Sequence, residues 1–384
     1  MTVYTLRGTV VTPYELISHG QVEITGGKIT YAGPRRRPLG EVRDQCDHLI
    51  CPGLIDVHVH GGAGHDAMDD DPGAMEAISG HLAAGGVTGF LATTQTAPGS
   101  ELLQSVRRLA AAAEAGLGGA KLLGLHLEGP YLSEEKRGAQ HGDHIRAADT
   151  EELKTLHDAA DGWMKVMTLA PEAPGALDAV GWLVERGVVA SAGHTDADYM
   201  TALEAFGRGL SHVCHLYNGM RGLHHREPGM LGAALTDGRV SVELVADGLH
   251  VHPAALRLAA LCKGPAKTVL VSDSIKHAGL PDGEYDYGDR TVTLRDGLAW
   301  LPGGVIAGST IRLNDAVRVM VEDAGFPVSE AVQMASTTPA RLLGLASGKG
   351  RLSEGMDADV AVMDWRFNVE ETIVGGETVY RSSW

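Results

Sequence analysis

The stretch PGLIDVHVHGG at residues 52–62 decides both the fold and the chemistry that the sequence predicts. An apolar run ends there in two histidines, His58 and His60, which one residue separates. Successive side chains of a strand point to opposite faces, so both imidazoles share one face if the run is a strand. Zinc, iron and similar ions favour imidazole ligands. The stretch therefore indicates one half of a metal site, provided that partner ligands recur further along the chain.

Partner residues do recur, each at the end of another apolar run. Four such runs close on Glu128, His194, His215 and Asp273. A catalytic metal site needs about three protein ligands and an open position for water or substrate. Solubility and packing do not explain why so many hydrophobic segments end in a ligand or an acid/base residue. We therefore interpret these residues as one metal-dependent catalytic site.

The middle of the chain alternates strands and helices. We expect strands near residues 50–60, 87–94, 121–128, 166–171, 188–194, 212–217, 240–247 and 268–273, with helices such as 101–115 and 150–160 between them. Strand–helix units in such a series predict an α/β fold, a (β/α)8 TIM barrel. A doubly wound open sheet is the alternative, but no Gly-x-Gly-x-x-Gly follows the first strand. Barrel enzymes place their sites at the C-terminal ends of the strands, where all of the candidate residues should converge.

The two ends of the chain have a different pattern. Residues 1–50 and 351–384 contain short strands with glycine-pair turns, which predict one small β-sandwich domain built from both chain termini. Residues 51–350 then form the barrel hydrolase domain. Within it, residues 285–307 are predicted to be an inserted hairpin that precedes a helix near 311–323.

Composition and net charge limit the kinds of molecule that the protein is expected to bind and the cell compartment in which it is expected. The formal net charge of −17 argues against nucleic acid and anionic membrane surfaces as partners. The N-terminus lacks the basic-then-apolar layout of a signal peptide, and no apolar stretch reaches the ~20 residues that span a bilayer. The four cysteines include no Cys-x-x-Cys pair and are interpreted as thiols. We expect a cytoplasmic protein.

Nine short segments carry a resemblance to a known family. They are HVHGG (58–62) after PGLID, HLEGPY (126–131), AGHT (192–195), HLYNGM (215–220), REPG (226–229), ADGLHV (246–251), SD (272–273), AGS (307–309) and GMDADV (355–360). In these segments the chain resembles the amidohydrolase superfamily and, within it, the N-acetylglucosamine-6-phosphate deacetylases. Many two-metal members bridge their ions with a carbamylated lysine at the end of strand four. Here Lys165 stands at the start of that strand, so Glu128 is the available bridging carboxylate, which favours a sugar-phosphate deacetylase over dihydroorotase-like or urease-like enzymes.

The resemblance implies a divalent metal cofactor and a hydrolytic mechanism. Glu128, His194 and His215 would be the core ligands, and His58 with His60 would allow a second ion, giving one or two ions per subunit. Zinc or iron is the expected metal, with manganese or cobalt as alternatives. Hydroxide formed at the metal would attack the acetyl carbonyl. Asp273 would take the proton from the water and deliver it to the leaving amine, yielding acetate and glucosamine 6-phosphate.

The same resemblance implies how a small amino-sugar phosphate would be bound. Arg226 would grip the phosphate from a neighbouring subunit, which implies a homodimer. His250, Asn218 and Gly219 match positions that contact the sugar.

The family also uses a histidine on the loop after strand three. Counting from Glu128 puts Gln140 at the usual spacing, whereas a shift of one residue brings in His141. We favour His141 as the substrate contact, and Gln140 remains the alternative.

The alternation of side chains along a strand predicts where two other histidines point. His212 has opposite parity to His215, so we expect it to face away from the mouth of the barrel. His126 shares a face with Glu128 and is expected to lie behind the metal ligands rather than among them.

Three other functions remain open at this point. Sugar epimers differ at one hydroxyl, so a deacetylase for N-acetylgalactosamine 6-phosphate fits the same residues. A non-catalytic scaffold would keep the barrel without its chemistry, although this chain retains every expected ligand. A phosphate-sensing module would bind the ligand without turnover.

Overall fold

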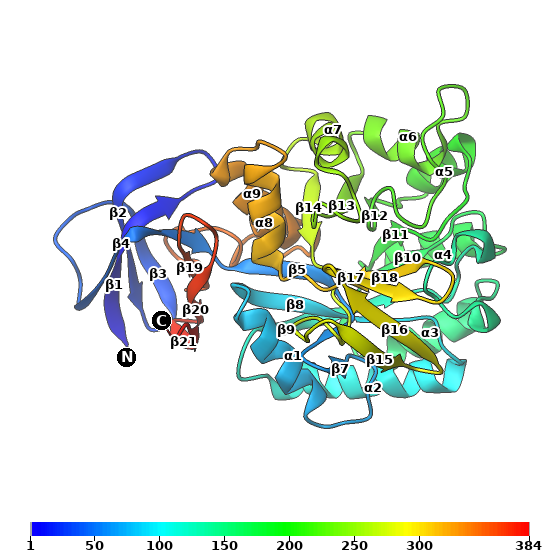
Figure 1. Cartoon of the computed structure of the whole chain (residues 1–384), viewed down its shortest axis with the longest axis horizontal. Helices are drawn as coiled ribbons and strands as arrows, with labels where there is room; N and C mark the ends of the chain where they lie inside the picture. Colours follow the sequence, from blue (N-terminus) through cyan, green and yellow to red (C-terminus); the bar gives the residue numbers. More distant parts are fainter. Residues whose placement is uncertain (1, 384) are drawn as a thin grey trace.

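Eight parallel strands form a nearly closed barrel in the computed structural model, which describes residues 2–383 (Figure 1). In chain order the barrel strands are β5 (Leu54–Val59), β8 (Val87–Thr94), β9 (Lys121–Glu128), β10 (Met164–Leu169), β11 (Val189–Ala192), β12 (His212–Val213), β13 (Ser241–Val245) and β14 (Thr268–Val271). Each strand pairs with the next in the same order around the sheet. The predicted (β/α)8 barrel is confirmed.

The barrel closes between its first and last strands. The last residue of β5, Val59, forms a parallel bridge with Ser274, which follows β14, and Asp273 N–H donates to the carbonyl oxygen of His58 over 2.9 Å. This seam joins two of the candidate site residues through the backbone. Their relative position is therefore fixed by barrel closure rather than by a mobile loop.

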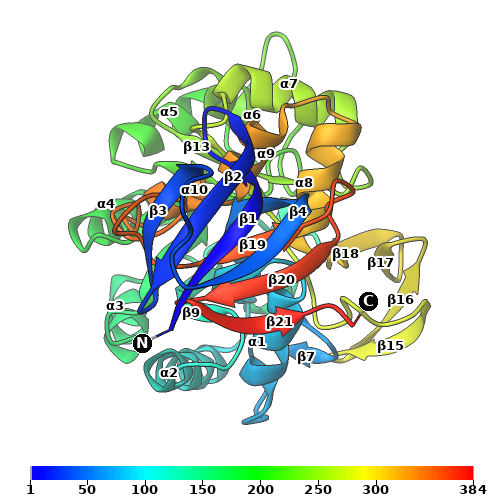
Figure 2. The same cartoon turned by 90° about the vertical axis from the view of Figure 1, so that its left-hand side faces the viewer.

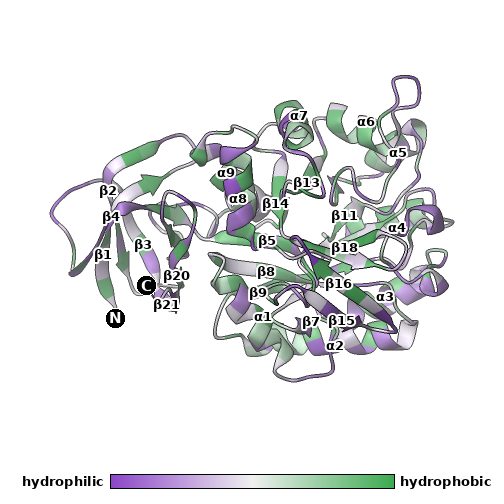
Figure 3. Ribbon diagram, in the orientation of Figure 1, coloured by the Kyte–Doolittle hydropathy of each residue, from purple (hydrophilic) through white to green (hydrophobic). Residues whose placement is uncertain are grey.

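Helices follow the barrel strands and cover them from outside (Figure 1). They are α1 (Ala74–Ala83), α2 (Gly99–Ala115), α3 (Thr150–Ala159), α4 (Ala176–Glu185), α5 (Tyr199–Gly207), α6 (Gly229–Thr236), α7 (Pro253–Lys263), α8 (Leu313–Glu322), α9 (Val328–Ala335) and α10 (Thr337–Leu342). Local sequence sets their starts: Asp149 caps α3 by accepting from Glu151 N–H, and Asp198 caps α5 by accepting from Thr201 N–H. Figure 3 shows apolar residues along the barrel strands and hydrophilic residues on the outer face of α8.

Both chain ends build a separate seven-stranded sheet, as the sequence predicts (Figure 2). Its strands are β1 (Val3–Val11), β2 (Leu16–Thr25), β3 (Lys28–Pro34), β4 (Glu41–Pro52), β19 (Val360–Met363), β20 (Val369–Val374) and β21 (Glu377–Arg381). β4 lies between β1 and β19, so it joins the N-terminal and C-terminal strands. The chain passes from β4 almost directly into β5, which attaches this sheet to the first strand of the barrel.

The segment after β14 differs from the predicted hairpin. It forms a four-stranded antiparallel sheet of β15 (Gly283–Tyr287), β16 (Arg290–Arg295), β17 (Leu298–Leu301) and β18 (Val305–Ser309). Glycines with positive φ at 288, 297 and 303 provide three turns where a hairpin has one. Val292, Leu294 and Ala299 are buried with Ile275 in a small core of their own. This inserted sheet covers one side of the barrel mouth.

Membrane and cysteine features can be stated for the described residues. Between residues 2 and 383, no helix combines the length and apolar character that crossing a membrane requires. Cys51 and Cys214 are buried free cysteines and Cys262 is an exposed one, whereas the side chain of Cys46 lies outside the described part of the structure.

Candidate metal and active site

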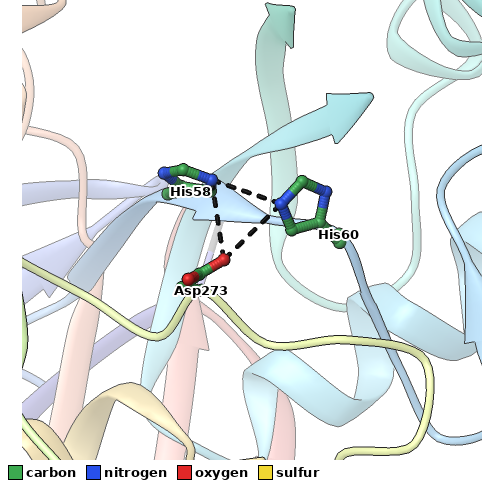
Figure 4. A group of neighbouring side chains, drawn as sticks. All are labelled: His58, His60 and Asp273. Carbon is green, nitrogen blue, oxygen red and sulfur yellow. Dashed lines mark hydrogen bonds and ion pairs between the residues drawn. The ribbon is translucent and has the colours of Figure 1, made fainter. Parts of the chain in front are cut away.

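Three side chains from the barrel seam point toward one another (Figure 4). His58 lies on β5, His60 follows it directly, and Asp273 follows β14. The Nε2 atoms of the two histidines are 3.3 Å apart, and Oδ1 of Asp273 lies 3.6 Å from Nε2 of His58 and 3.5 Å from Nε2 of His60. All three are buried. They could hold one metal ion between them.

A second buried group lies beside the first. Oε1 of Glu128 is 3.1 Å from Nε2 of His194 and 2.9 Å from Nε2 of His215, and these two nitrogens are 3.2 Å apart. Glu128 also reaches the first group, because its Oε2 lies 3.3 Å from Nε2 of His60. One carboxylate thus lies between two sets of donors, as a bridging ligand would.

The hydrogen bonds of the four imidazoles leave Nε2 available in every ring. Each Nδ1 faces an oxygen that can only accept, so each Nδ1 carries the proton. The acceptors are Oε2 of Glu243 for His58 (2.9 Å), the carbonyl of Thr93 for His60 (3.2 Å), the carbonyl of Lys136 for His194 (2.9 Å) and the carbonyl of Asn218 for His215 (3.2 Å). The four Nε2 atoms therefore face the centre of the site, where they could coordinate a cation in place of a proton.

This arrangement fits a bound cation. Within each group two Nε2 lone pairs face each other at about hydrogen-bond distance, beside a carboxylate. Two unprotonated Nε2 atoms at this distance repel each other unless a proton or a metal cation lies between them. Imidazole and carboxylate together are donors that suit zinc, iron, manganese and cobalt. The residues present thus fit a divalent metal.

The electrostatics of the site also favour positive charge. Burial lowers the pKa of His58, but the negative charges of Glu243, Asp273 and Glu128 outweigh it and raise that pKa well above its usual range. Burial raises the pKa of Glu128, but the charges of His194 and His58 and the hydrogen bonds outweigh it and hold that pKa well below its usual range. Glu128 is therefore an ionised carboxylate.

The backbone at the strand ends is strained where the candidate residues stand. His194, His215 and Asp273 have φ angles of 45°, 26° and 51°, a region that L-residues adopt at a cost of roughly 1–2 kcal/mol each. Backbone hydrogen bonds hold the conformation: His194 O accepts from Ser133 N–H, and Asp273 O accepts from Ser309 N–H. Strain of this kind concentrates at functional sites, where it aims a side chain.

A cavity of about 170 Å³ opens above the two groups. Its walls include His60, Gln95, Glu128, Gly138, Ala139, Gln140, His194, His215, Asn218, Gly219, His250, Asp273, Ile275, Tyr287, Ile306 and Gly308. The predicted contacts Asn218, Gly219 and His250 thus all line it. Gly219, with φ of 59°, lies so close to His194 that a Cβ would be 3.0 Å from Nδ1 of that ring. A side chain at this position would displace the ligand.

The loop after β9 places Gln140, rather than His141, in the cavity. Nε2 of Gln140 donates to Oε2 of Glu128 over 2.5 Å, and Oε1 accepts from Thr96 N–H over 2.8 Å. His141 lies in a neighbouring pocket, where its Nε2 is 3.2 Å from Nη2 of Arg290. The spacing from Glu128 that the sequence offers as the alternative therefore matches the geometry.

Two other predicted substrate residues differ in their surroundings. Nδ1 of His250 is 2.6 Å from Oδ2 of Asp247; burial lowers the pKa of His250, but this hydrogen bond outweighs it and raises that pKa. Arg226 lies on an exposed loop, with its Nη1 2.8 Å from Nε2 of His225, and is not among the residues that line this chain's own cavity.

Sequence reasoning missed several residues of the site. Glu243, in the middle of β13, is completely buried and contacts both His58 and His212. An acidic residue inside the otherwise apolar run VSVELV is the signal that could have found it. Tyr287 comes from the inserted sheet, and its hydroxyl donates to Oε1 of Gln95 at the cavity wall. No pattern in the sequence places that insertion over the site.

Comparisons with known proteins agree with this geometry. The sequence pattern of the amidohydrolase family matches residues 49–379. The chain is 39% identical over 379 residues to the N-acetylglucosamine-6-phosphate deacetylase of Bacillus subtilis (strain 168), covering 97% of this chain and 96% of the relative. It is 41% identical over 336 residues to the N-acetylgalactosamine-6-phosphate deacetylase of Escherichia coli O157:H7, covering 88% and 89%.

The structure also matches a solved deacetylase. An aspartate-to-alanine variant of N-acetyl-D-glucosamine-6-phosphate deacetylase from Mycobacterium smegmatis, in complex with N-acetyl-D-glucosamine-6-phosphate, aligns with a TM-score of 0.94 and 34% identity. The match covers 99% of this chain and 100% of that one. The likeness thus extends over the barrel, the terminal sheet and the inserted sheet.

Proposed function

The chain belongs to the amidohydrolase family, within its amino-sugar-phosphate deacetylases, and we propose that it hydrolyses the acetamide of N-acetylglucosamine 6-phosphate to glucosamine 6-phosphate and acetate. One observation carries the proposal: two buried donor groups share Glu128 at the floor of a cavity that Asp273 lines. An amide is unreactive toward water, so hydrolysis needs an activated nucleophile and a group that moves protons.

Each of two sets of donor residues would bind one metal ion. Glu128, His194 and His215 would hold one divalent ion, and His58 and His60 with Asp273 would provide a second position. Zinc or iron suits both sets, with manganese or cobalt as alternatives. When bound, the metal lowers the pKa of a water ligand and polarises the acetyl carbonyl.

Asp273 moves the protons. Its carboxylate borders both the donor groups and the cavity, so it reaches the attacking water and the scissile amide. Oδ1 takes the proton of the water as the new C–O bond forms. The same proton then passes to the amine nitrogen as the C–N bond breaks, which makes the amine a leaving group.

The cavity walls orient the sugar. Gln140 is placed to contact the acetamide, because its amide borders the cavity and is anchored at both ends, to Glu128 and to Thr96. Asn218 and Gly219 line the cavity beside His194, and His250 offers a hydrogen-bond donor to a sugar hydroxyl. His141 is not needed for these contacts.

Arg226 binds the phosphate of the neighbouring subunit's substrate in a homodimer. It lies on an exposed turn that a bridge between His224 and Glu227 closes, and its guanidinium suits bidentate contact with a phosphate. A net charge of −17 makes a local cation necessary for binding an anionic sugar. We also infer a cytoplasmic location, because a phosphorylated sugar does not cross a bilayer unaided.

The experiment that tests the substrate assignment measures acetate release from the two epimeric 6-phosphates. The 41% identity to the Escherichia coli relative makes N-acetylgalactosamine 6-phosphate the second candidate. A higher kcat/KM for the glucosamine epimer supports the proposal, and a higher value for the galactosamine epimer replaces it with the second candidate. Release from neither would overturn the deacetylase assignment.

A further inference from the structure

A completely buried carboxylate lies beneath both donor groups and is used by neither. Oε2 of Glu243 is 2.9 Å from Nδ1 of His58, and it also accepts from the backbone N–H of His215 over 3.2 Å. Oε1 of Glu243 is 2.9 Å from Nε2 of His212, whose Nδ1 is 2.8 Å from Oγ of Ser241. Glu243 is thus held in one position by a chain of hydrogen bonds that begins on its own strand.

The contacts of Glu243 distinguish His58 from the other candidate ligands. The Nδ1 atoms of His60, His194 and His215 donate to backbone carbonyls, which no side-chain substitution removes. Among these four histidines, only His58 relies on another side chain to hold the proton on Nδ1, which leaves Nε2 for the metal. A carboxylate partner also makes the imidazole a stronger donor to a cation than a carbonyl partner does.

From these contacts we propose that Glu243 is a positioning residue that sets the affinity of the metal position formed by His58, His60 and Asp273, and that it ties this position to His215 of the other one. This inference rests on the metal centre of the proposed function. The effect on the His58 position is direct, through the ring. The effect on the other position is confined to one backbone contact and is therefore small.

Metal binding without substrate tests the inference separately from deacetylation. Metal-free wild type, Glu243→Gln and Glu243→Met are titrated with Zn²⁺ against a competing chelator, and thermal unfolding of each metal-free protein is recorded. We expect two ions in the wild type. Gln keeps one acceptor for His58 but not the negative charge. Glu243→Gln should therefore bind the ion at the His58 position about 10- to 100-fold more weakly, and should bind the other ion with an affinity within a few-fold of wild type. The thioether of Met is only a weak acceptor and carries no charge, so Glu243→Met should lose the weakened ion.

Two reference variants make the outcome specific. Asp56 is another buried carboxylate of the barrel interior, which touches backbone N–H groups of His58 and Ser272 but no imidazole. Asn keeps an oxygen that can accept from the same backbone N–H groups, so Asp56→Asn should bind both ions normally. With Co²⁺, the one-ion form of Glu243→Met should give the same absorption spectrum as His60→Gln.

Several results would overturn the inference. They are a single ion in the wild type, equal weakening of both ions in Glu243→Gln, and unchanged affinity in both Glu243 variants. If Glu243→Met does not fold, Glu243→Gln alone decides. Acetate release by the wild type is measured separately, so a failure of this inference leaves the proposed function standing.

Discussion

Gln140 donates a hydrogen bond of 2.5 Å from its Nε2 to Oε2 of Glu128, the carboxylate that both donor groups share. The loop after β9 therefore contributes directly to the centre of the site. Gln140, and not the neighbouring His141, thus lines the cavity next to the candidate metal ligands.

Replacing Gln140 should reduce catalysis. Loss of a hydrogen bond to a charged group costs about 1.5–3 kcal/mol, so kcat/KM of Gln140→Ala should fall roughly 10- to 100-fold. His141→Ala is the matched control from the same loop and should stay within about 3-fold of wild type, since its ring contacts Arg290 outside the cavity. Steady-state acetate release measures kcat/KM for both variants. A large loss of kcat/KM in His141→Ala, together with a normal value in Gln140→Ala, would contradict the assignment of Gln140.

Asp273→Asn should separate proton transfer from metal binding. Proton transfer by a positioned group contributes about 10²- to 10⁴-fold, and kcat should fall by that factor. The ion held by Glu128, His194 and His215 should remain, because those ligands are untouched. Metal analysis and turnover on one sample test this. Near-normal turnover in the variant would show that another group moves the proton.

Metal binding should stabilise the fold. A ligand present at 100 times its Kd adds about 2.7 kcal/mol to the free energy of unfolding. Urea unfolding with Zn²⁺ and with a chelator should show this gain in wild type and in His141→Gln, and a much smaller one in His194→Gln. If the wild type unfolded at the same urea concentration with Zn²⁺ and with the chelator, that result would argue against a metal site in the folded protein.

Arg226 can be tested by mixing two inactive proteins. In a homodimer with Arg226 acting across the interface, Arg226→Ala and Asp273→Asn subunits together form one complete site per mixed dimer. Random exchange should then restore about a quarter of wild-type activity, because half of the dimers are mixed and each has one working site. No recovery despite demonstrated subunit exchange would place Arg226 outside the partner's site.

The terminal sheet offers a prediction about pH and stability. Asp357 pairs with Lys28 at 2.6 Å and with Lys349 at 2.9 Å, which links β3 to the chain before β19. Burial raises the pKa of Asp357, but the hydrogen bonds from both lysines outweigh it and lower that pKa. A lowered folded-state pKa stabilises above the unfolded-state value of about 4, and the gain disappears as the pH falls through the folded-state pKa.

Asp357→Asn should therefore reduce the free energy of unfolding by about 1–2 kcal/mol at pH 7 and by much less at pH 3. The exposed Asp323 forms no side-chain hydrogen bond in the described residues, so Asp323→Asn should change little at either pH. Urea unfolding at both pH values measures the difference. A destabilisation that is the same at pH 7 and pH 3 would show that the charge of Asp357 does not cause it.

The barrel and the convergence of its site were predictable because apolar runs ending in His58, Glu128, His194, His215 and Asp273 mark the C-terminal ends of strands. Parallel strands of one barrel bring these ends together whatever the details of the helices. The sequence therefore indicated that these residues converge before any contact was known.

Finer geometry was not predictable by the same reasoning. Parity placed His212 away from the mouth, yet its ring contacts Glu243 in the barrel interior. β12 ends at Val213, so strand parity does not extend to His215, whose φ is 26°. His212 is not among the residues that line the cavity, as expected, but strand parity does not explain its place in the barrel interior. His126 is buried beside the ring of His58 and outside the cavity, with its Nε2 2.8 Å from Oγ1 of Thr168, so it lies behind a candidate ligand as expected.

The most direct test of the central claim is acetate release from N-acetylglucosamine 6-phosphate by metal-loaded protein, beside unphosphorylated N-acetylglucosamine and the chelator-treated protein. The account predicts rapid release from the phosphorylated sugar, much slower release from the unphosphorylated one, and none above background after chelation. Release that continues at the same rate in metal-free protein, or no release from metal-loaded protein, would contradict it.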